Sequence, residues 1–587
     1  MRQGSDGALN RFAQIYGAAA GFIFFASGAV YLFLGRWPVT HQDFWVFYDN
    51  FLHRSWFYSS IVKYNGHSLI FPCQIWLANL HFFHGSQDSL FAIGLAFELA
   101  ATAILLLAIF RDRSIDATIR IAATVTIIFG NFWMGRASMT ASGAFNCAYS
   151  LVLVGATLAF LCLPKLAGES DRQATLLVTI LVANVVASFS FGTGMAAWGA
   201  TLVTAYCLRA RGWKLAVLAA AATASAVIFL ALPPHGSAAS FGASLPLSRP
   251  ATYLTLFGYL CRLLGSPWLH MCAAWSGVKN PDEAVYAGVA MYAGLLGLLL
   301  VSAVLAEKLW RRNLRGGMEL IGFALLTFNF IAFILIIIAR ARHIHEIPSE
   351  LNAPRYLYWS ALFWTGAFLI ALTWAQSKAG LRWPIIASAL ALPIIAFPSH
   401  YQEALRFRYV RMLGQTAGTS LVNGVHDKTQ IQILSPFPDL VYRLSQEMRA
   451  RRLDMFAPGY QDWIGQRATA VFPAPLVTLR LNGKCHGVGV GPGNSALRLN
   501  GSAATRAKVT PDVLVILGPD EVVRGIARST ATGEWLNHFL YGRTFSPFAF
   551  VGFIAGYNPQ LAYKIRAVRG RSVSRETIAV PISAEQP

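Results

Sequence analysis

Residues Phe12–Leu34 read FAQIYGAAAGFIFFASGAVYLFL and carry no charged side chain. An apolar run of about 20 residues is long enough to cross the hydrocarbon core of a bilayer as a helix. The short polar segment before it lacks a convincing small-residue cleavage site, so we expect a retained first span and not a cleaved signal peptide. Further apolar runs follow along the chain, and together they predict a polytopic α-helical membrane protein.

The composition of the whole chain favours the same class. Of its 587 residues, 55% are hydrophobic and 13% are charged, against about 25% charged in typical soluble proteins. This charge deficit excludes an ordinary water-soluble enzyme. The formal net charge is nevertheless +21. Membrane lipids with anionic headgroups, or substrates that carry phosphate, account for that excess, and we expect no nucleic-acid partner.

Eleven segments are expected to span the membrane. Their approximate bounds are 12–34, 89–110, 120–134, 149–163, 175–191, 193–208, 215–232, 284–305, 318–340, 357–375 and 383–397. Lysine and arginine collect in alternate short loops, which the positive-inside rule assigns to the cytoplasm. With the N-terminus inside, an odd number of spans places the C-terminal region outside. We therefore expect a bacterial inner-membrane protein with a periplasmic C-terminal domain.

Three regions are expected along the chain. Residues 1–397 form the transmembrane domain, residues 398–470 a periplasmic helical connector, and residues 471–587 a small periplasmic β-sandwich. Short strand-like runs beyond residue 473 support the last assignment, with Gly518-Pro-Asp-Glu521 as a hairpin turn. Cys261 and Cys272 fall in one predicted outer loop and could form a disulfide, although two separate thiols are the favoured interpretation.

The long outer loop after the first span gathers residues suited to catalysis and binding. Asp43 lies nine residues beyond Leu34, and we predict that it is a catalytic base. A positioned carboxylate can take the proton of a sugar hydroxyl, which is a poor nucleophile by itself. The residues of this loop with predicted substrate-binding roles are His41, Asp49, Lys63 and His67. The alternative is an ordinary solvated loop, in which Asp49 caps a helix and His67 is a packed structural histidine.

Basic residues are also expected at the outer ends of several spans. They are Arg136, Arg340, Arg342 and Arg355, the last followed by Tyr356. Arginine can hold a phosphate group through several donors at fixed angles, so we predict that these residues bind substrate phosphate. The alternative for each arginine is interfacial anchoring by a snorkelling side chain.

Four short motifs in this order resemble the GT-C superfamily of membrane glycosyltransferases, in particular a group of poorly characterised bacterial members. The motifs are Asp43-Phe-Trp45, Asn65-Gly-His-Ser-Leu-Ile-Phe-Pro72, Asn131-Phe-Trp133 and Arg355-Tyr356. The resemblance covers roughly residues 10–400. Relatives tend to carry an acidic residue beside the histidine, where this chain has Gly66. This difference speaks against a metal ion bound beside His67. A divalent metal ion bound elsewhere as a cofactor is not excluded.

The resemblance implies an inverting glycosyltransferase that uses a polyprenyl-phosphate-linked sugar as donor. The acceptor would be a glycan or glycolipid of the cell envelope, on the periplasmic face. Arg355 would hold the donor phosphate, and Asp43 would deprotonate the acceptor hydroxyl. Two alternatives are a transporter or flippase of lipid-linked glycans, and a non-catalytic scaffold for envelope assembly.

Overall fold

The computed structural model describes the chain in nine stretches. They are residues 2–168, 171–234, 250–277, 284–476, 480–490, 495–506, 511–530, 546–580 and 584–585. The chain divides into two compact units. The helical unit comprises Met1–Phe33, Trp56–Ile75 and Leu90–Leu405, and the mixed unit comprises Leu34–Ser55, Trp76–Ser89 and Arg406–Pro587.

Nine helices of the described residues are long and apolar enough to cross a membrane. They are α1 (Arg2–Gly35), α5 (Gln87–Arg111), α6 (Ala117–Phe132, extended to Arg136 by the 3-10 turn η1), α8 (Ala144–Ala167), α11 (Gly212–Ala231), α13 (Ala284–Arg311), α14 (Met318–Glu346), α15 (Pro354–Ser377) and α16 (Ala379–Val422). The two other predicted spans fall on the shorter helices α9 (Gln173–Ser188) and α10 (Ala196–Cys207). The prediction of a multi-pass helical membrane protein is confirmed, while the number of spans stays a prediction.

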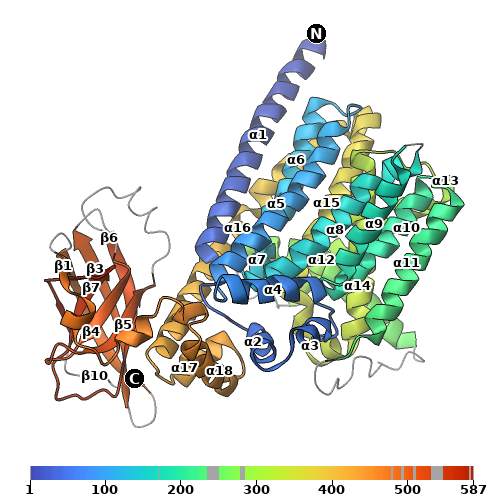
Figure 1. Ribbon diagram of the computed structural model, residues 1–587. Coiled ribbons are helices and arrows are strands. Elements are labelled where there is room, and N and C mark those ends of the chain that lie inside the picture. The colour runs from blue at the N-terminus through green and yellow to red at the C-terminus, as the bar shows by residue number, and fades with distance from the viewer. Residues whose placement is uncertain are drawn as a thin grey trace. The chain divides into compact units, whose positions relative to one another are not determined.

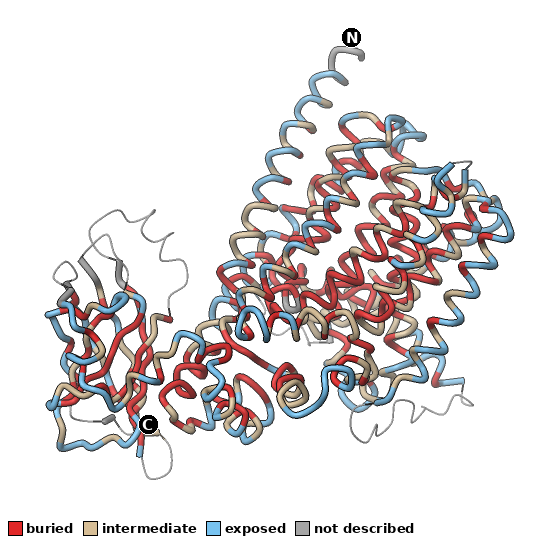
Figure 2. The backbone as a smooth tube through the Cα atoms, viewed as in Figure 1, coloured by how far each residue is buried: buried red, intermediate tan, exposed pale blue. Residues whose placement is uncertain are grey.

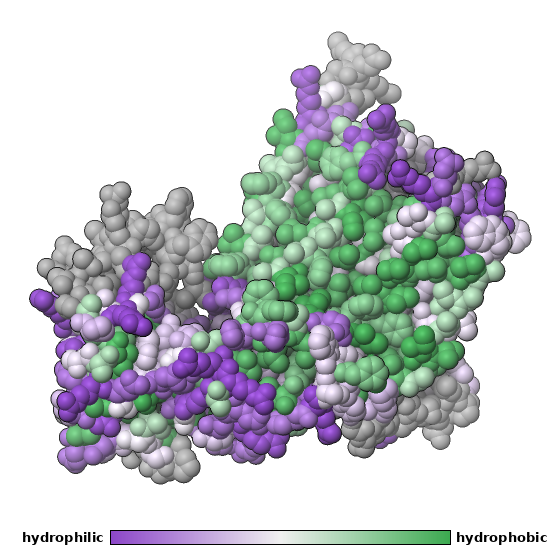
Figure 3. All heavy atoms as spheres, viewed as in Figure 1, coloured by the Kyte–Doolittle hydropathy of each residue, from purple (hydrophilic) through white to green (hydrophobic). Residues whose placement is uncertain are grey.

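The helices of this unit run side by side, as the ribbon in Figure 1 shows. Burial separates central helices from peripheral ones. In α15, 78% of the most apolar 18-residue window is buried inside the unit, whereas in α11 the share is 17%. Figure 2 shows the same contrast along the backbone, and Figure 3 shows the apolar surface that the outer helices leave exposed. Such a surface suits contact with lipid chains.

Helices α14 and α15 approach each other closely because glycines face one another. A Cβ atom at Gly366 would lie 2.8 Å from the carbonyl oxygen of Gly322, and one at Gly322 would lie 3.0 Å from the Cβ of Leu369. Small residues at a helix crossing allow backbones to pack against each other inside a membrane. This crossing fixes the two helices whose ends carry Arg340 and Arg355.

Further elements connect the spans. They are α3 (Trp56–Ile61), α4 (Ile70–Phe82), η1 (Met134–Arg136), α7 (Ala137–Thr140), η2 (Gly192–Met195), α12 (Pro250–Trp275) and η3 (Pro348–Asn352). The predicted outer loop 233–282 falls partly outside the described residues, and its described middle forms helix α12. Cys261 is buried in α12 and Cys272 is exposed on it, and both are free thiols, as the favoured interpretation holds.

The mixed unit combines helices and one sheet. Its helices are α2 (Phe44–His53), the end of α16, α17 (Lys428–Leu434), α18 (Pro438–Ala450), η4 (Asp454–Phe456), η5 (Tyr460–Trp463) and α19 (Ala468–Val471). The strands are β1 (Ala474–Leu476), β2 (Arg480–Val490), β3 (Ala496–Arg506), β4 (Val513–Leu517), β5 (Val523–Ser529), β6 (Ser546–Ala555), β7 (Lys564–Arg569), β8 (Ser572–Ser574), β9 (Ile578–Ala579) and β10 (Ala584–Glu585).

The described strands pair into one continuous sheet, in the order β1-β8-β7-β4-β5-β6-β3-β2-β10, with β9 beside β7. Most neighbours are antiparallel, and the pairs β1–β8 and β2–β10 are parallel. The structure thus shows a mainly antiparallel sheet, and the sandwich arrangement stays a prediction. The predicted turn at residues 518–521 is confirmed by the hydrogen bond from the Gly518 amide to the Val522 carbonyl, 2.9 Å.

Both faces of the sheet are covered at its centre. Leu514 and Ile516 of β4 enter one apolar cluster, and Val513, Val515 and Leu517 enter another. Successive side chains of a strand point to opposite faces, so a strand that is buried throughout needs packing on both sides. This explains why β4 is apolar at every position.

The observed units are not the predicted domains. A boundary was expected at residue 397, but α16 continues as one helix from Ala379 to Val422. The predicted outer loop 35–88 is divided as well, because residues 34–55 and 76–89 group with the C-terminal region while 56–75 group with the helices. Asp43 and His67 therefore belong to different compact units.

Candidate functional site

The helical unit contains a cavity of about 350 Å³. Its wall is formed by the end of α14, the start of α15, and residues of α8, η2, α11 and the segment before α4. Most of the lining is apolar or aromatic, including Tyr149, Phe191, Ile338 and Trp359. A cavity of this size with apolar walls and a few convergent polar groups is typical of small-molecule sites.

Two arginines reach this cavity from neighbouring helix ends. Arg340 follows the apolar run of α14, and Arg355 follows Pro354 in the first turn of α15. The Arg340 guanidinium donates to the carbonyl oxygen of Asn65 over 3.4 Å. Arg355 forms an ion pair with Glu350, and its side chain is 37% exposed. Both positive charges therefore lie where a bound anion can reach them.

His67 contributes the third polar group. The segment before α4 turns back on itself through a pair of backbone hydrogen bonds between Tyr64 and His67, 3.0 and 2.8 Å long. The imidazole stacks on Phe191, with 4.0 Å between ring centroids and 20° between planes. A Cβ at Gly192 would lie 2.5 Å from Nδ1 of this ring, so glycine makes room for it.

The pKa of His67 reflects both its burial and the two positive charges at the cavity. Burial, together with the positive charges of Arg340 and Arg355, lowers the pKa of His67 to about 3. The ring is therefore neutral near pH 7 and can donate one hydrogen bond. An anion placed between the arginines would oppose their effect and raise the pKa of His67.

Thr193 adds an unsatisfied hydroxyl to the same wall. Its side chain is buried, and its Oγ1 has no hydrogen-bond partner among the described residues. A buried polar atom without a partner costs free energy unless a ligand or water meets it. The cavity therefore has a polar corner, where a ligand could satisfy the hydrogen-bonding capacity of the Thr193 hydroxyl.

Four of the residues chosen from the sequence line this one cavity, namely His67, Arg340, Arg355 and Tyr356. Lys63 lies beside it. Its ammonium group donates to the carbonyl oxygens of Phe229 and Leu230, each 3.2 Å away, and so caps the end of α11. Arg342 is exposed and pairs with Glu346 over 2.8 Å.

Arg136 lies in the interior of the bundle and not at the interface where it was expected. Its side chain is 1% exposed and pairs with Glu98 over 3.0 Å. The guanidinium lies 3.7 Å from the centroid of the Tyr358 ring, and the Tyr358 hydroxyl donates to Glu98 over 2.7 Å. Burying either charge alone would be costly, so this pair explains why Glu98 is tolerated in an apolar helix.

The remaining predicted residues lie in the mixed unit. Asp43 is half-buried at the N-terminal end of α2. His41 is packed against Trp37, with ring centroids 3.6 Å apart, and burial lowers its pKa to about 3. Asp49 is 3.2 Å from His53 and 3.7 Å from Arg443, so it belongs to an ionic cluster.

Sequence reasoning did not identify Asp454. This carboxylate is 8% exposed and accepts a hydrogen bond of 2.8 Å from the Thr40 amide. Burial raises its pKa to about 6. Thr40 and Asp454 are far apart in the chain, and no local spacing connects them.

No protein-family model, curated protein or solved structure matches this chain. Within the stretches that the structure describes, no group of three or more His, Cys, Asp or Glu side chains could hold a metal ion. Function is therefore inferred from the geometry and charge of the cavity itself.

The cavity suits a ligand with two different ends. Two guanidinium groups, a neutral imidazole and a free hydroxyl can surround a phosphate, since arginine binds phosphate through paired donors. The apolar walls formed by α11 and α14 would contact a hydrocarbon chain. A phosphate monoester of a lipid alcohol has both properties.

Proposed function

We propose that this chain is an inverting glycosyltransferase. It moves a sugar from a polyprenyl-phosphate-linked donor to a glycan or glycolipid acceptor of the cell envelope. Localisation in a bacterial inner membrane, with the reaction at the periplasmic face, is part of the same proposal. The observation that carries it is the meeting of Arg340, Arg355 and His67 at one end of an otherwise apolar cavity.

The residues of the cavity would hold the donor phosphate. A polyprenyl phosphate that leaves the sugar gains negative charge as the bond between the anomeric carbon and the phosphate oxygen breaks. Arg340 and Arg355 stabilise that charge in the transition state, which is the interaction that accelerates a chemical step. Thr193 and His67 can each add one hydrogen bond to the phosphate.

Asp43 is proposed as the base, a role that rests on its position in the sequence. Its carboxylate would take the proton of the acceptor hydroxyl as the oxygen attacks the anomeric carbon. The electron pair of the broken bond leaves with the lipid phosphate. One displacement of this kind inverts the anomeric configuration.

Binding to the cavity can be measured without knowing the sugar. Farnesyl phosphate is a short polyprenyl phosphate, and farnesol is the same chain without the charge. We expect the full chain in nanodiscs to bind farnesyl phosphate more tightly than farnesol. Arg355→Gln should weaken binding by roughly tenfold or more, as expected for loss of a hydrogen bond to a charged group.

Arg342→Gln is the matched control, because Arg342 is exposed and pairs with Glu346 on the same helix. Its affinity should stay close to that of the wild type. Equal affinity for the phosphate and the alcohol would contradict the proposed phosphate site.

Turnover tests the chemical step. Release of polyprenyl phosphate should be measured from a panel of polyprenyl-phosphate hexoses and pentoses. We expect Asp43→Asn to keep farnesyl phosphate affinity and to lose roughly 100-fold or more in transfer rate, the usual contribution of a general base. Full transfer activity in this variant would refute the role of Asp43.

A flippase is the second candidate, and one observation favours it. Buried polar groups lie inside the bundle, including the Glu98–Arg136 pair and Asn146, whose amide atoms have no hydrogen-bond partner among the described residues. Such groups can mark a polar path through a membrane. A flippase would move a fluorescent lipid phosphate across the membrane of vesicles that contain the protein. Neither the wild type nor Asp43→Asn would then release polyprenyl phosphate from the donor.

A further inference from the structure

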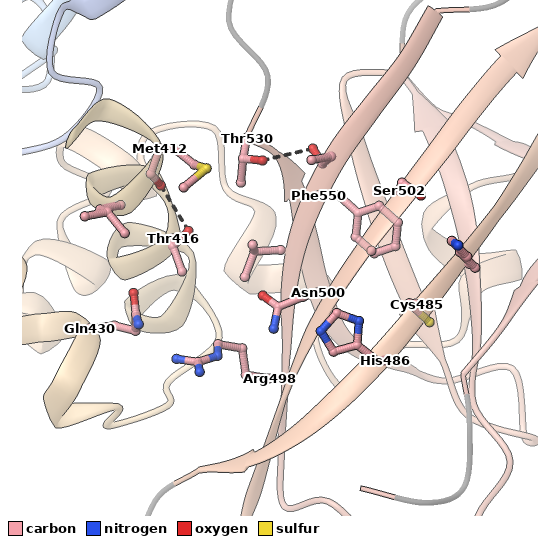
Figure 4. Close-up of a pocket in the computed structure, with 15 residues that line it drawn as sticks. Met412, Thr416, Gln430, Cys485, His486, Arg498, Asn500, Ser502, Thr530 and Phe550 are labelled. Carbon is pink, nitrogen blue, oxygen red and sulfur yellow. Dashed lines mark hydrogen bonds between the residues drawn. The ribbon is translucent and has the colours of Figure 1, made fainter. Parts of the chain in front are cut away.

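A second cavity, of about 680 Å³, lies within the mixed unit. One side is formed by the last turns of α16, with Met412 and Thr416, and by Gln430 of α17. The other side is formed by strands β2, β3 and β6. Figure 4 shows side chains from the helices and the strands around the space between them. This volume is large enough for a di- or trisaccharide.

Strand register explains why this side of the sheet is polar. His486 is paired with Asn500, and Lys484 with Ser502, so these four side chains point to one face. Their neighbours in sequence point to the other face, where Leu499 enters the apolar core of the sheet. On this face β6 is apolar, with Val551 and Phe553 packed against Val425 just after α16, whereas β2 and β3 present polar side chains beside it. Side chains that only packed against helices would be apolar in all three strands.

Polar atoms in the cavity wall lack partners. Nε of Arg498 and Oε1 of Gln430 are buried without a hydrogen-bond partner among the described residues, and both side chains lie around the cavity in Figure 4. Arg498 is held by Asp427, with 3.2 Å between Nη1 and Oδ2. The Asp427 carboxylate thus orients the guanidinium group, while Nε–H of Arg498 stays available to donate to a ligand.

The charge of the wall selects the ligand. Lys484 and Arg498 carry positive charge, and Asp427, the partner of Arg498, is not among the described residues that line the cavity, none of which is acidic. The remaining polar groups are the amides of Gln430 and Asn500, the imidazole of His486, and hydroxyl groups. These amides and hydroxyls match the donors and acceptors of a polyol, the apolar side chains of the wall can contact the carbon faces of sugar rings, and the cations match an anionic substituent.

We propose that this cavity binds an acidic oligosaccharide, meaning a short chain of sugars that carry carboxylate groups. The site lies wholly within the mixed unit and is distinct from the cavity of the helical unit. Binding at this site does not depend on the glycosyltransferase proposal. The site gives the C-terminal region a recognition function of its own.

Calorimetric titration of the full chain in nanodiscs tests this proposal with three probes. They are trigalacturonate, the neutral trisaccharide maltotriose, and inorganic phosphate. We expect saturable binding of trigalacturonate, about tenfold or more weaker binding of maltotriose, and no competition by equimolar phosphate, since the cations and the polyol-binding groups act together.

Two variants locate the binding. Asn500→Ala removes an amide from the wall and should weaken trigalacturonate binding by roughly tenfold, and Lys484→Gln should weaken it by roughly threefold or more and reduce its dependence on salt. Lys484 is exposed, so the second variant is expected to fold. Arg571→Gln, an exposed charge in the turn between β7 and β8, is the matched control and should bind normally.

Three outcomes would overturn the proposal. The first is equal affinity for the acidic and neutral trisaccharides, which would remove the role of the cations. The second is full displacement by phosphate, which would make this a simple anion site. The third is unchanged trigalacturonate binding in both Lys484→Gln and Asn500→Ala.

Discussion

The arginines of the helical unit differ in what neutralises them. Arg136 is enclosed with Glu98 and Tyr358, so its charge is satisfied inside the protein. Arg340 and Arg355 reach a cavity wall, where burial and their positive charges together lower the pKa of His67. A buried charge needs a fixed partner, whereas a charge at a cavity can exchange its partner for a ligand. Arg136 therefore has a structural role, whereas the charges of Arg340 and Arg355 are placed to serve the proposed phosphate binding.

Asp454 provides a pH-dependent test at the residue scale. Its pKa is raised from 3.8 to about 6, so the folded protein holds this proton more tightly than the unfolded chain does. The resulting stabilisation is present below about pH 4 and is lost as pH rises through about 6. At about 1.4 kcal/mol per pKa unit, the loss is on the order of 3 kcal/mol.

Asp454→Asn removes this titration and keeps an oxygen that can accept from the Thr40 amide. We expect the variant to melt near the wild-type temperature at pH 4 and above it at pH 7.5, measured by scanning calorimetry of the full chain in nanodiscs. If the difference in melting temperature between the wild type and Asp454→Asn is the same at pH 4 and pH 7.5, Asp454 does not titrate as described.

The pairing of α14 with α15 positions the helical cavity at the element scale. Gly322 and Gly366 let the helices approach closely, and the two helices bring Arg340 and Arg355 to the same wall. A larger side chain at the crossing would meet backbone atoms, which cannot move aside as a flexible side chain can.

Gly366→Leu should therefore separate the helices. We expect a loss of about 1–3 kcal/mol in stability, as for other overpacked interiors, and weaker binding of farnesyl phosphate. Gly288→Leu in α13 is the control, because a Cβ there would meet no atom within 4 Å. Both variants should be compared by thermal melting and by titration. A Gly366→Leu protein that behaves like Gly288→Leu would contradict this account of the crossing.

At the scale of the whole molecule, the apolar helices establish that the chain is a multi-pass membrane protein. Its predicted orientation rests on the distribution of lysine and arginine along the sequence. The proposed reaction requires the cavity end of the helical unit to face the periplasm, and places residues such as Arg113 at the opposite, cytoplasmic end.

Cysteine labelling in intact bacteria tests this orientation. In a background with Cys272 and Cys485 replaced by Ser, we expect Arg571→Cys to react with an impermeant maleimide. Arg113→Cys should react only after the membrane is permeabilised. The reverse pattern would place the C-terminal sheet in the cytoplasm and would refute the proposed periplasmic reaction.

Much of the secondary structure could be predicted from local sequence. All eleven apolar runs fall on helices, because a backbone in hydrocarbon must satisfy its hydrogen bonds internally. The strand-like runs from residue 496 onward fall on β3 to β7, whereas most of β2 was not predicted. β4 was recognisable as a short continuous apolar run, which is typical of a strand that is buried on both faces. The single sheet was not predicted, because strand pairing depends on contacts between residues far apart in the chain.

The sequence by itself determined the membrane class, the helices, and the residue types suited to phosphate, namely Arg340, Arg355 and His67. Only the tertiary structure decided that these residues share a cavity. It also showed that Arg136 forms a buried ion pair with Glu98, and that the Thr193 hydroxyl lies in the cavity wall without a hydrogen-bond partner among the described residues. The reason is physical. Hydropathy and spacing act along the chain, whereas partnership between charges depends on which helices pack together, and that is set by side-chain shape across the whole bundle.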